Sequence, residues 1–308
     1  MPAGKQRFIL KASVTFIILV GLISLAGISV NATTTRFGNI GWAFWLPGLF
    51  LLIAGIVATW GSATSLLDAR ALRAHRANPL DTFSDGQTLA LTGQVIVDGD
   101  VPTAPYSGTP CAAYSYQVSG QRRGAGSSSS DYRQQLCLLG YRLANAALDT
   151  GARRFPLLAI PDVDDEFRAT SLGGEWGDAA LVHIRSAAEA WTSNSEAEAR
   201  GALEDARRNT IAPQSADLFV VSTATGANQI SILEDTLPVA TTITILGTYA
   251  SGSEGLDGRR IGGMKAFPGD IDERLQVLDL EWRKGLKVGL PLLAVGLALL
   301  TPAWWWPA

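Results

Sequence analysis

Three long apolar runs stand out along the chain, one near its start, a second soon after, and a third near its end. They cover residues 12–32, 40–61 and 285–306, and the first two contain no charged side chain. A helix of about 20 mostly apolar residues can cross a lipid bilayer, and each run reaches that length. Trp residues border the second and third runs, as expected at a membrane interface. The pattern therefore predicts a multi-pass α-helical membrane protein with three spans.

Between the second and third runs, apolar and polar residues alternate repeatedly. Such alternation is typical of strands with one buried face. Residues 186–208 and 270–284 instead have helical composition, and residues 62–79 are expected to form a juxtamembrane helix that continues from the second run. We therefore predict one mainly β (α+β) domain with helical insertions over residues 80–284. Its expected strands are 88–97, 112–118, 133–142, 155–160, 179–184, 219–222, 229–233 and 241–246.

Lys and Arg residues gather at the ends of the apolar runs that would share one side of the membrane. Cytoplasmic segments are enriched in these residues. We therefore expect the N-terminal tail 1–11 and the domain 80–284 in the cytoplasm, and the loop 33–39 and the C-terminus outside the cell (inner) membrane. The flanking basic residues are Lys5, Arg7, Lys11, Arg70, Arg73, Arg76, Arg283, Lys284 and Lys287.

The first apolar run has a second interpretation. Its basic start, its apolar stretch and the sequence Val30-Asn31-Ala32 together resemble a signal peptide with a cleavage site. The run is longer than the apolar region of about 7–15 residues that is usual in signal peptides. We therefore predict an uncleaved span, with cleavage as the alternative.

Charge and composition narrow the range of partners. The formal net charge is −3, and charged residues make up 17% of the chain. A nucleic-acid-binding domain usually carries a basic excess, so we expect membrane lipid and an unidentified protein as partners, and no nucleic acid. Gly285 and Gly289 have the spacing of closely packed membrane helices, which leaves a homo-oligomer open.

Residues 103–118 (TAPYSGTPCAAYSYQV) combine a sharp turn with the start of a strand. Pro fixes its own φ, Gly108 can adopt a positive φ, and the Ser107 side chain can bind the nearby backbone. Cys111 follows at the start of the strand, where a small and weakly polar side chain packs well. The turn is therefore expected to serve the architecture of the domain, and Cys111 to be a buried thiol.

This segment resembles the start of the GIDE domain, also called the beside-a-membrane domain. A second segment resembles the strand-turn-strand motif of the same family, except that Ala240 stands where a Gly is usual. The resemblance implies a RING-less, prokaryotic-type member related to the membrane part of mitochondrial RING ubiquitin ligases. The matching positions are Gly93, Pro105, Ser107, Gly108, Pro110, Cys111, Tyr114 and Tyr116 in the first segment, and Glu234, Leu237 and Gly247 in the second.

Counting potential zinc ligands excludes RING ligase activity for this chain. A RING needs eight Cys or His ligands for two zinc ions, whereas the sequence has Cys111, Cys137, His75 and His183. The run 258–265 (GRRIGGMK) has Met264 where a phosphate-binding loop needs Lys. The acidic run 162–166 matches no calcium-loop spacing. We expect polar turns at both places, no cofactor, no metal and no catalytic residue.

The resulting functional prediction is a non-catalytic, GIDE-like module that binds a partner or ligand at the cytoplasmic membrane surface. The alternative is an enzyme-class role, as a component of a membrane-bound ubiquitin-ligase-like or hydrolase system. In that case the activity would reside in a partner or in a site that spacing does not reveal, built for example from Ser107, His183 and Asp178.

Overall fold

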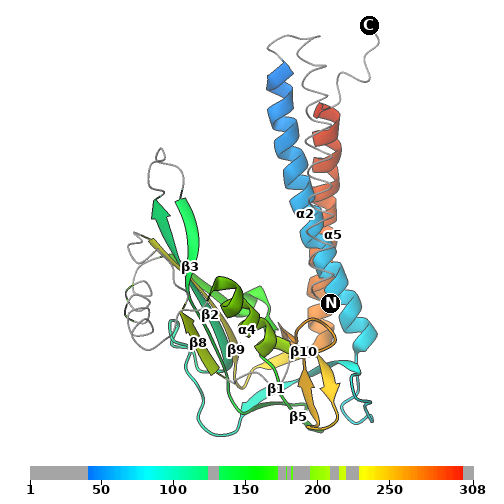
Figure 1. Ribbon diagram of the computed structural model, residues 1–308. Coiled ribbons are helices and arrows are strands. Elements are labelled where there is room, and N and C mark those ends of the chain that lie inside the picture. The colour runs from blue at the N-terminus through cyan, green and yellow to red at the C-terminus, as the bar shows by residue number, and fades with distance from the viewer. Residues whose placement is uncertain are drawn as a thin grey trace. The chain divides into compact units, whose positions relative to one another are not determined.

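The computed structural model describes residues 41–123, 132–172, 195–208, 215–219 and 229–300, together with Asp178 and Val182. The chain divides into two compact units (Figure 1). The first unit contains most of α2 (Gly41–His75) and α5 (Ile271–Leu300). The second unit, His75–Ile271, holds the strands and the remaining described helix.

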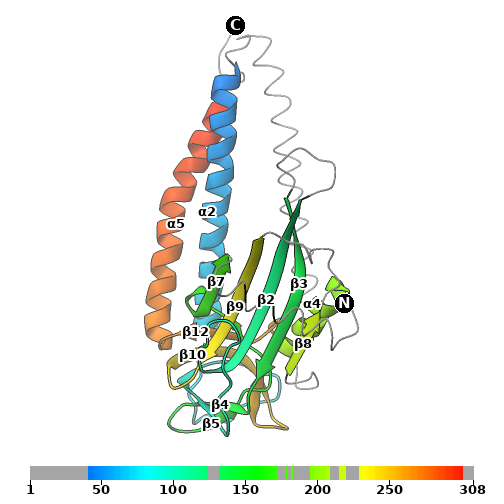
Figure 2. The same cartoon turned by 90° about the vertical axis from the view of Figure 1, so that its left-hand side faces the viewer.

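The second unit is built on two sheets. The seven-stranded sheet has the order β5-β4-β1-β10-β12-β6, with β11 on β10. The five-stranded sheet has the order β7-β9-β2-β3-β8, which can be followed in Figure 2. The strands of the first sheet are β1 (Thr88–Val97), β4 (Ala146–Asp149), β5 (Arg154–Pro156), β6 (Asp162–Val163), β10 (Thr242–Ala250), β11 (Gly255–Asp257) and β12 (Lys265–Pro268). Those of the second are β2 (Cys111–Arg123), β3 (Tyr132–Leu143), β7 (Arg168–Leu172), β8 (Ser215–Phe219) and β9 (Gln229–Pro238).

One hydrophobic core joins the two sheets. Strands β1 and β10 pair antiparallel and contribute Leu91, Ile243 and Ile245, all of which are fully or almost fully buried. Tyr141 of β3 and Leu237 of β9 enter the same core from the five-stranded sheet. Burying an aliphatic side chain of this size stabilises a fold by about 1.5–3 kcal/mol. The core therefore fixes the second sheet against the first.

Helix α4 (Glu196–Arg208) is the described helix of the second unit, and its termini are well defined. Ser195 and Glu198 form a capping box, with Glu198 N donating to Ser195 Oγ over 3.3 Å and Ser195 N donating to Glu198 Oε2 over 2.8 Å. At the other end, the carbonyls of Ala206 and Arg208 accept hydrogen bonds from Ile160 N and Gly258 N. These contacts tie the C-terminus of α4 to loops of the seven-stranded sheet.

Helices α2 and α5 approach each other at small residues. A Cβ atom added at Gly289 would lie 2.7 Å from Thr59 Cγ2 and 3.1 Å from Thr59 N, and one added at Gly296 would lie 2.7 Å from Leu52 N. Glycine therefore permits backbone-to-backbone contact here, as in closely packed membrane helices. The GxxxG spacing of α5 is thus used within the chain. Arg73 and Asp279 form an ion pair across the same two helices.

The prediction of a three-span, multi-pass helical membrane protein is wrong. The described residues form three α-helices and two sheets, and one of these helices, Pro47–His75, is long and apolar enough to cross a membrane. Of the predicted third span, the structure describes residues 285–300 of α5, which are 300 − 284 = 16 residues, and residues 301–306 lie outside the described residues. About 20 are needed. The predicted first span, 12–32, lies outside the described residues.

The exposed face of α2 favours association with a membrane. Phe50, Val57 and Trp60 have 72%, 67% and 45% of their surfaces exposed, and they lie within the apolar helix Pro47–His75. Surface helices of soluble proteins usually turn polar residues outward. Large apolar side chains on the outer face are instead expected where the surroundings are lipid.

Candidate functional site

The carboxylate of Glu234 lies beneath the turn at residues 105–108. Glu234 is fully buried on β9, and its two oxygens accept hydrogen bonds from Tyr106 N over 2.9 Å and from Ser107 N over 2.8 Å. Hydrogen bonds to a charged group are stronger than those between neutral groups. The turn and β9, which lie far apart in the sequence, therefore meet at this contact.

The turn also holds itself through its own backbone. Ala104 N donates to Thr109 O over 2.9 Å, and Gly108 N donates to Ala104 O over 3.1 Å. Gly108 has a φ of 67°, which glycine adopts without strain. The Ser107 hydroxyl accepts a 3.3 Å hydrogen bond from Thr109 N. The Ser107 side chain is thus part of the turn, as its sequence context predicts.

Three tyrosines pack together beside the turn. The rings of Tyr106 and Tyr116 meet edge to face at 5.2 Å, and Tyr114 stacks on Tyr116 at 6.2 Å. The Tyr116 hydroxyl donates a short hydrogen bond to Asp217 of β8. Burial, followed by the nearby carboxylates, raises the pKa of Tyr106 and of Tyr116 above the ordinary value. Both phenols are therefore neutral at physiological pH and serve as packing groups and hydrogen-bond donors.

Gly140 of β3 makes room for this tyrosine cluster. A Cβ atom at this position would lie 2.3 Å from the Tyr116 hydroxyl oxygen and 2.6 Å from the Asp217 carboxylate. Contacts this short do not occur in folded proteins, so a larger residue would displace the Tyr116 side chain. The sequence analysis did not single out Gly140 or Asp217, because their roles depend on strand register rather than on a local motif.

Cys111 is a buried, protonated thiol at the start of β2. Its Sγ donates a weak 3.8 Å hydrogen bond to the Pro102 carbonyl. Burial, followed by the charge of Glu234, raises the pKa of the Cys111 thiol to about 12. Because the thiolate is the reactive form of cysteine, Cys111 is unreactive at neutral pH. Cys137 is likewise buried and not disulfide-bonded.

Asp235 lies next to Glu234 on β9 but faces the opposite side of the sheet, because side chains alternate along a strand. Its carboxylate contacts Arg168 Nε at 2.7 Å and Arg207 of α4 at 3.6 Å. Only 9% of the Asp235 side chain is exposed. The charge of Asp235 is thus neutralised by two guanidinium groups, and the pair of contacts links β7, β9 and α4.

Carboxylates of the acidic run 162–166 also form ion pairs with arginines or hydrogen bonds with the backbone. Asp162 faces Arg207 at 3.7 Å, Asp165 faces Arg168 at 2.6 Å, and the Asp164 side chain caps the 3₁₀ turn η2 (Asp165–Phe167). Within the described ranges of the chain, no three His, Cys, Asp or Glu side chains are grouped closely enough to hold a metal ion. These carboxylates instead stabilise the local fold.

The remaining residues singled out in the sequence analysis lie in both sheets and in the turn before β2. A Cβ atom at Gly93 of β1 would lie 2.4 Å from the Asp149 carbonyl, so glycine is required where β4 passes. Leu237 is fully buried, and Gly247 lies in β10, packed near Leu256. Ala240 has a φ of 57°, a left-handed conformation that glycine adopts more easily than alanine. Pro105 and Pro110 flank the turn itself.

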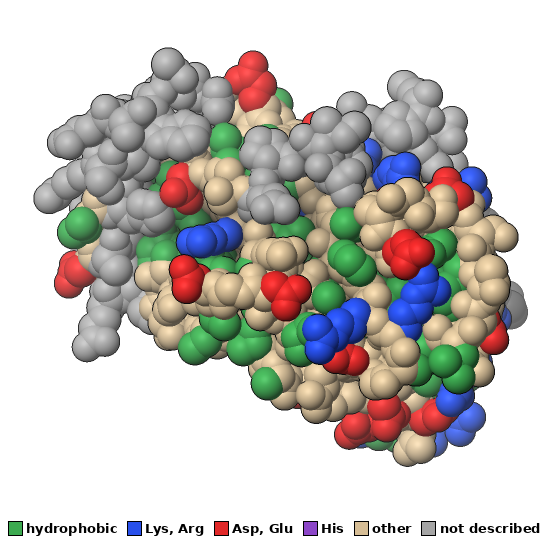
Figure 3. Space-filling model, turned by 90° about the horizontal axis from the view of Figure 1, so that it is seen from below, with side chains coloured by type: hydrophobic (Ala, Val, Ile, Leu, Met, Phe, Trp, Pro, Cys, Tyr) green, Lys and Arg blue, Asp and Glu red, His purple; other side chains and the backbone are tan. Residues whose placement is uncertain are grey.

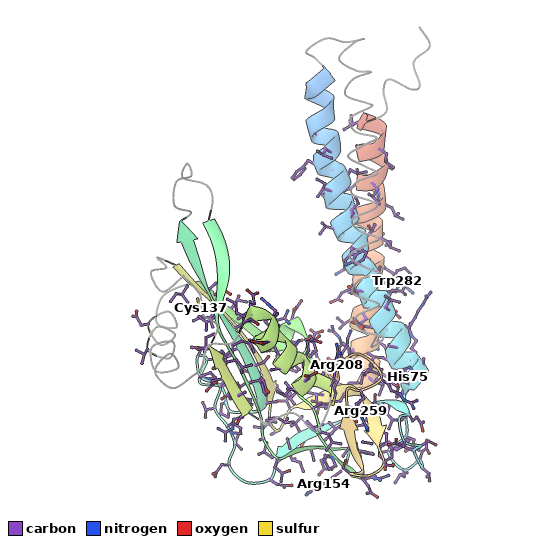
Figure 4. The ribbon with its side chains drawn as sticks, in the orientation of Figure 1. His75, Cys137, Arg154, Arg208, Arg259 and Trp282 are labelled. Atoms are coloured by element: carbon purple, nitrogen blue, oxygen red, sulfur yellow. The ribbon has the colours of Figure 1, made fainter. Side chains whose placement is uncertain are left out.

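Other candidate residues are separated or undescribed. His75 is the last residue of α2 (Figure 4), and the run 258–265 forms the turn between β11 and β12, with Met264 fully buried. Asp178 is exposed. His183 lies outside the described residues, so the hypothetical set of Ser107, His183 and Asp178 stays untested. The basic residues near the N-terminus, Lys5, Arg7 and Lys11, also lie outside the described residues, whereas Arg70, Arg73, Arg283, Lys284 and Lys287 lie on α2 and α5, and Arg76 directly follows α2.

The face of the molecule seen in Figure 3 carries both acidic and basic side chains. On the face shown in Figure 3, acidic and basic side chains are interspersed among apolar and neutral ones. A nucleic-acid-binding surface would instead gather Lys and Arg on one face. Comparison with family models, curated proteins and solved structures finds no match to this chain.

Proposed function

We propose that the protein is a membrane-anchored, non-catalytic module whose GIDE-like β domain binds a protein partner or ligand at the cytoplasmic surface of the cell membrane. The observation that carries the proposal is the contact of Glu234 with Tyr106 and Ser107. It joins two segments that each resemble the same family, although 128 positions separate Glu234 from Tyr106. A shared family would account for both the sequence pattern and this contact.

The chemistry of the described cluster supports a non-catalytic role. Glu234 binds backbone amides, Asp217 accepts from a phenol, and Asp235 is paired with two arginines. The Cys111 thiol, with its pKa raised to about 12, lacks the thiolate character of a nucleophile. Each of these groups therefore has a structural role that leaves no activated acid, base or nucleophile among them.

The side of the membrane is inferred from the residues that follow the apolar part of α2. Arg70 and Arg73 lie on its last turns and Arg76 directly after it. Such residues are enriched on the cytoplasmic side of the membrane. The β unit, which follows directly in the chain, would then lie in the cytoplasm.

Protease protection tests the location. Protease added to intact spheroplasts is expected to leave the β unit whole, whereas it should digest this unit after the membrane is permeabilised. Carbonate washing of the same membranes should leave the protein in the pellet. Digestion in intact spheroplasts would place the β unit outside the cytoplasm and contradict the proposal.

Chemical probes and co-purification test the function. Fluorophosphonate and iodoacetamide probes should not label the folded protein, and a partner should co-purify after mild detergent extraction from wild-type membranes but not from a Glu234→Ala strain. Labelling of Ser107 that Ser107→Ala removes would instead support the hydrolase alternative.

A further inference from the structure

A group of basic and aromatic residues lies at one level of the α2–α5 pair. We call Trp60, Arg283, Lys284 and Lys287 the basic collar. All four are exposed, and the exposed fraction of Trp60 is 45%. Within the described residues, none of the three cations forms an ion pair. Arg283 contacts the ring of Trp282 at 5.7 Å (Figure 4 labels Trp282 on α5).

Helix packing places the collar residues at the same height. A Cβ atom at Gly285 would lie 1.9 Å from Ser62 Oγ and 3.2 Å from Ala58 O, so Gly285 faces the turn of α2 that contains Trp60. Each helical residue adds about 1.5 Å along the axis. Arg283 and Lys287, two residues on either side of Gly285, therefore lie within about 3 Å of its level.

The collar coincides with a change of composition on both helices. Pro47–Trp60 of α2 and residues 288–300 of α5 contain no Asp, Glu, Lys, Arg or His, and Gly289 packs these two stretches together at Thr59. On the other side of the collar, charged residues appear on both helices, among them the Arg73–Asp279 pair. On α5 the charged residues therefore reach the collar itself, whereas on α2 small, hydroxyl and Leu residues follow Trp60 and the first charged residue is Asp68, about 12 Å further along the helix.

The carboxylates nearest to the collar in sequence already have partners. Glu281 accepts a 3.2 Å hydrogen bond from Ser65 Oγ, and Asp279 binds Arg73 and also accepts from Trp282 Nε1 over 3.2 Å. Ser65 is neutral, so Glu281 keeps its negative charge, and Asp279 also attracts Arg283 electrostatically. Arg73 and the three collar cations outnumber these two carboxylates, which leaves a local positive charge next to an apolar surface. Indole rings favour the lipid–water boundary, and Lys and Arg near that boundary attract anionic headgroups.

We propose that the basic collar binds the phosphate groups of anionic phospholipids and so fixes the depth of α2 in the bilayer. This inference rests on the proposed function, because it requires α2 to be in a membrane. The apolar stretch of α5 ends at the three collar cations, and the exposed indole of Trp60 on α2 lies at the same level. A lipid surface matches the boundary, the exposed indole and the charge together.

The test measures the lipid preference of the full-length protein. Purified protein is exposed to equal amounts of phosphatidylglycerol and phosphatidylcholine, and native mass spectrometry counts the lipids retained. We expect roughly a tenfold preference for phosphatidylglycerol in the wild type, and its loss in the variant R283Q/K284Q/K287Q. The charge-conserving variant R283K/K284R/K287R should keep the preference.

A matched control removes three cations from the β unit. The variant R154Q/R200Q/R260Q has the same change in net charge and should bind lipid like the wild type. Retained preference in the collar Gln variant, or lost preference in the control or in the charge-conserving variant, would overturn the inference. Carbonate extraction of the wild type separates the two ideas, because a protein that stays in the membrane without lipid preference contradicts only the collar.

Discussion

At the scale of single residues, Glu234 has the largest structural role in the candidate site. It is fully buried, and its two oxygens each accept a hydrogen bond from a backbone amide of the same turn. The sequence compared the segment of Glu234 and the segment of the turn with the same family, but it did not show that the two segments are in contact. Their contact depends on the register that places Tyr116 of β2 opposite Glu234 of β9.

Replacing Glu234 should therefore destabilise the β unit. Glu234→Ala leaves the buried amide of Tyr106 and the half-buried amide of Ser107 without their acceptor, and each unsatisfied buried group costs about 1–3 kcal/mol. We expect the free energy of unfolding in urea to fall by about 3 kcal/mol or more. The control Glu204→Gln, in an exposed ion pair of α4, should change it by less than about 1 kcal/mol. Equal effects of the two variants would show that the turn does not depend on Glu234.

Ala240 offers a substitution that should stabilise the fold. Its φ of 57° costs a non-glycine residue about 1–2 kcal/mol. Glycine removes this strain, but its greater conformational freedom in the unfolded chain offsets part of the resulting stabilisation. Ala240→Gly should raise the free energy of unfolding by about 1 kcal/mol. Ala202→Gly, within α4, should lower it by a similar amount. A lower melting temperature for Ala240→Gly would contradict the strain.

The Cys111 thiol should make stability depend on alkaline pH. Burial raises the pKa of Cys111 from 9.0 to about 12 in the folded state. The contribution of the buried thiol to the free energy of unfolding is complete below pH 9 and is lost as the pH rises from 9 towards 12. The reason is that the thiol loses its proton at lower pH in the unfolded chain than in the folded protein. The stability advantage of the wild type over Cys111→Ala should thus shrink between pH 8 and 10.5 in urea titrations. The raised phenol pKa values act in the same direction but are common to both proteins.

At the scale of elements, the length of a segment decided how well the sequence predicted it. The ten-residue alternation of residues 88–97 predicts β1 with its observed bounds. Strands β5, β6 and β11 have only two or three residues, which is too short to show a period. The network of Asp235 with Arg168 and Arg207 was missed because it joins three distant segments. The spacing of residues within one segment does not predict a contact between distant segments.

The position of α4 should depend on Asp235. Asp235→Asn removes the charge that two arginines neutralise, which leaves Arg168 and Arg207 less well satisfied. Breaking a buried ion pair from one side typically costs about 3–5 kcal/mol. We expect a loss near the lower end, because Arg168 keeps Asp165, together with faster hydrogen exchange in α4. Asp165→Asn, whose side chain is 89% exposed, should change stability by less than about 1 kcal/mol.

At the scale of the whole molecule, the described chain consists of a close helix pair and a β unit inserted between its members. The three-span prediction is wrong because, among the described residues, one helix, Pro47–His75, is long and apolar enough to cross a membrane, and the described part of the predicted third span has 300 − 284 = 16 residues. The contact between α2 and α5 at Gly55, Gly289 and Gly296 could not be derived from the sequence, since glycines in apolar helices serve many purposes. Packing geometry alone assigns them to this interface.

A larger side chain at Gly289 should separate the helix pair. In Gly289→Leu the new side chain meets the backbone of α2, which is near enough that Thr59 N lies 3.1 Å from an added Cβ. Overpacking of this kind costs about 1–3 kcal/mol, so the melting temperature in detergent should fall. Gly61→Leu is the matched control, because nothing lies within 4 Å of a Cβ atom there. If Gly61→Leu lowered the melting temperature and Gly289→Leu did not, the placement of Gly289 in the interface between α2 and α5 would be wrong.

The insertion of the β unit between two helices that touch has a consequence for its folding. Residues 75–271 make up 271 − 74 = 197 positions whose two ends stay tethered as long as α2 and α5 hold together. The tether restricts the denatured chain much as a cross-link would, and for a loop of this length the chain-entropy model gives about 5 kcal/mol. The helix pair would thus stabilise the β unit by holding its two ends together. A fragment without the two helices would lose this entropic stabilisation, although every contact of its own core would remain.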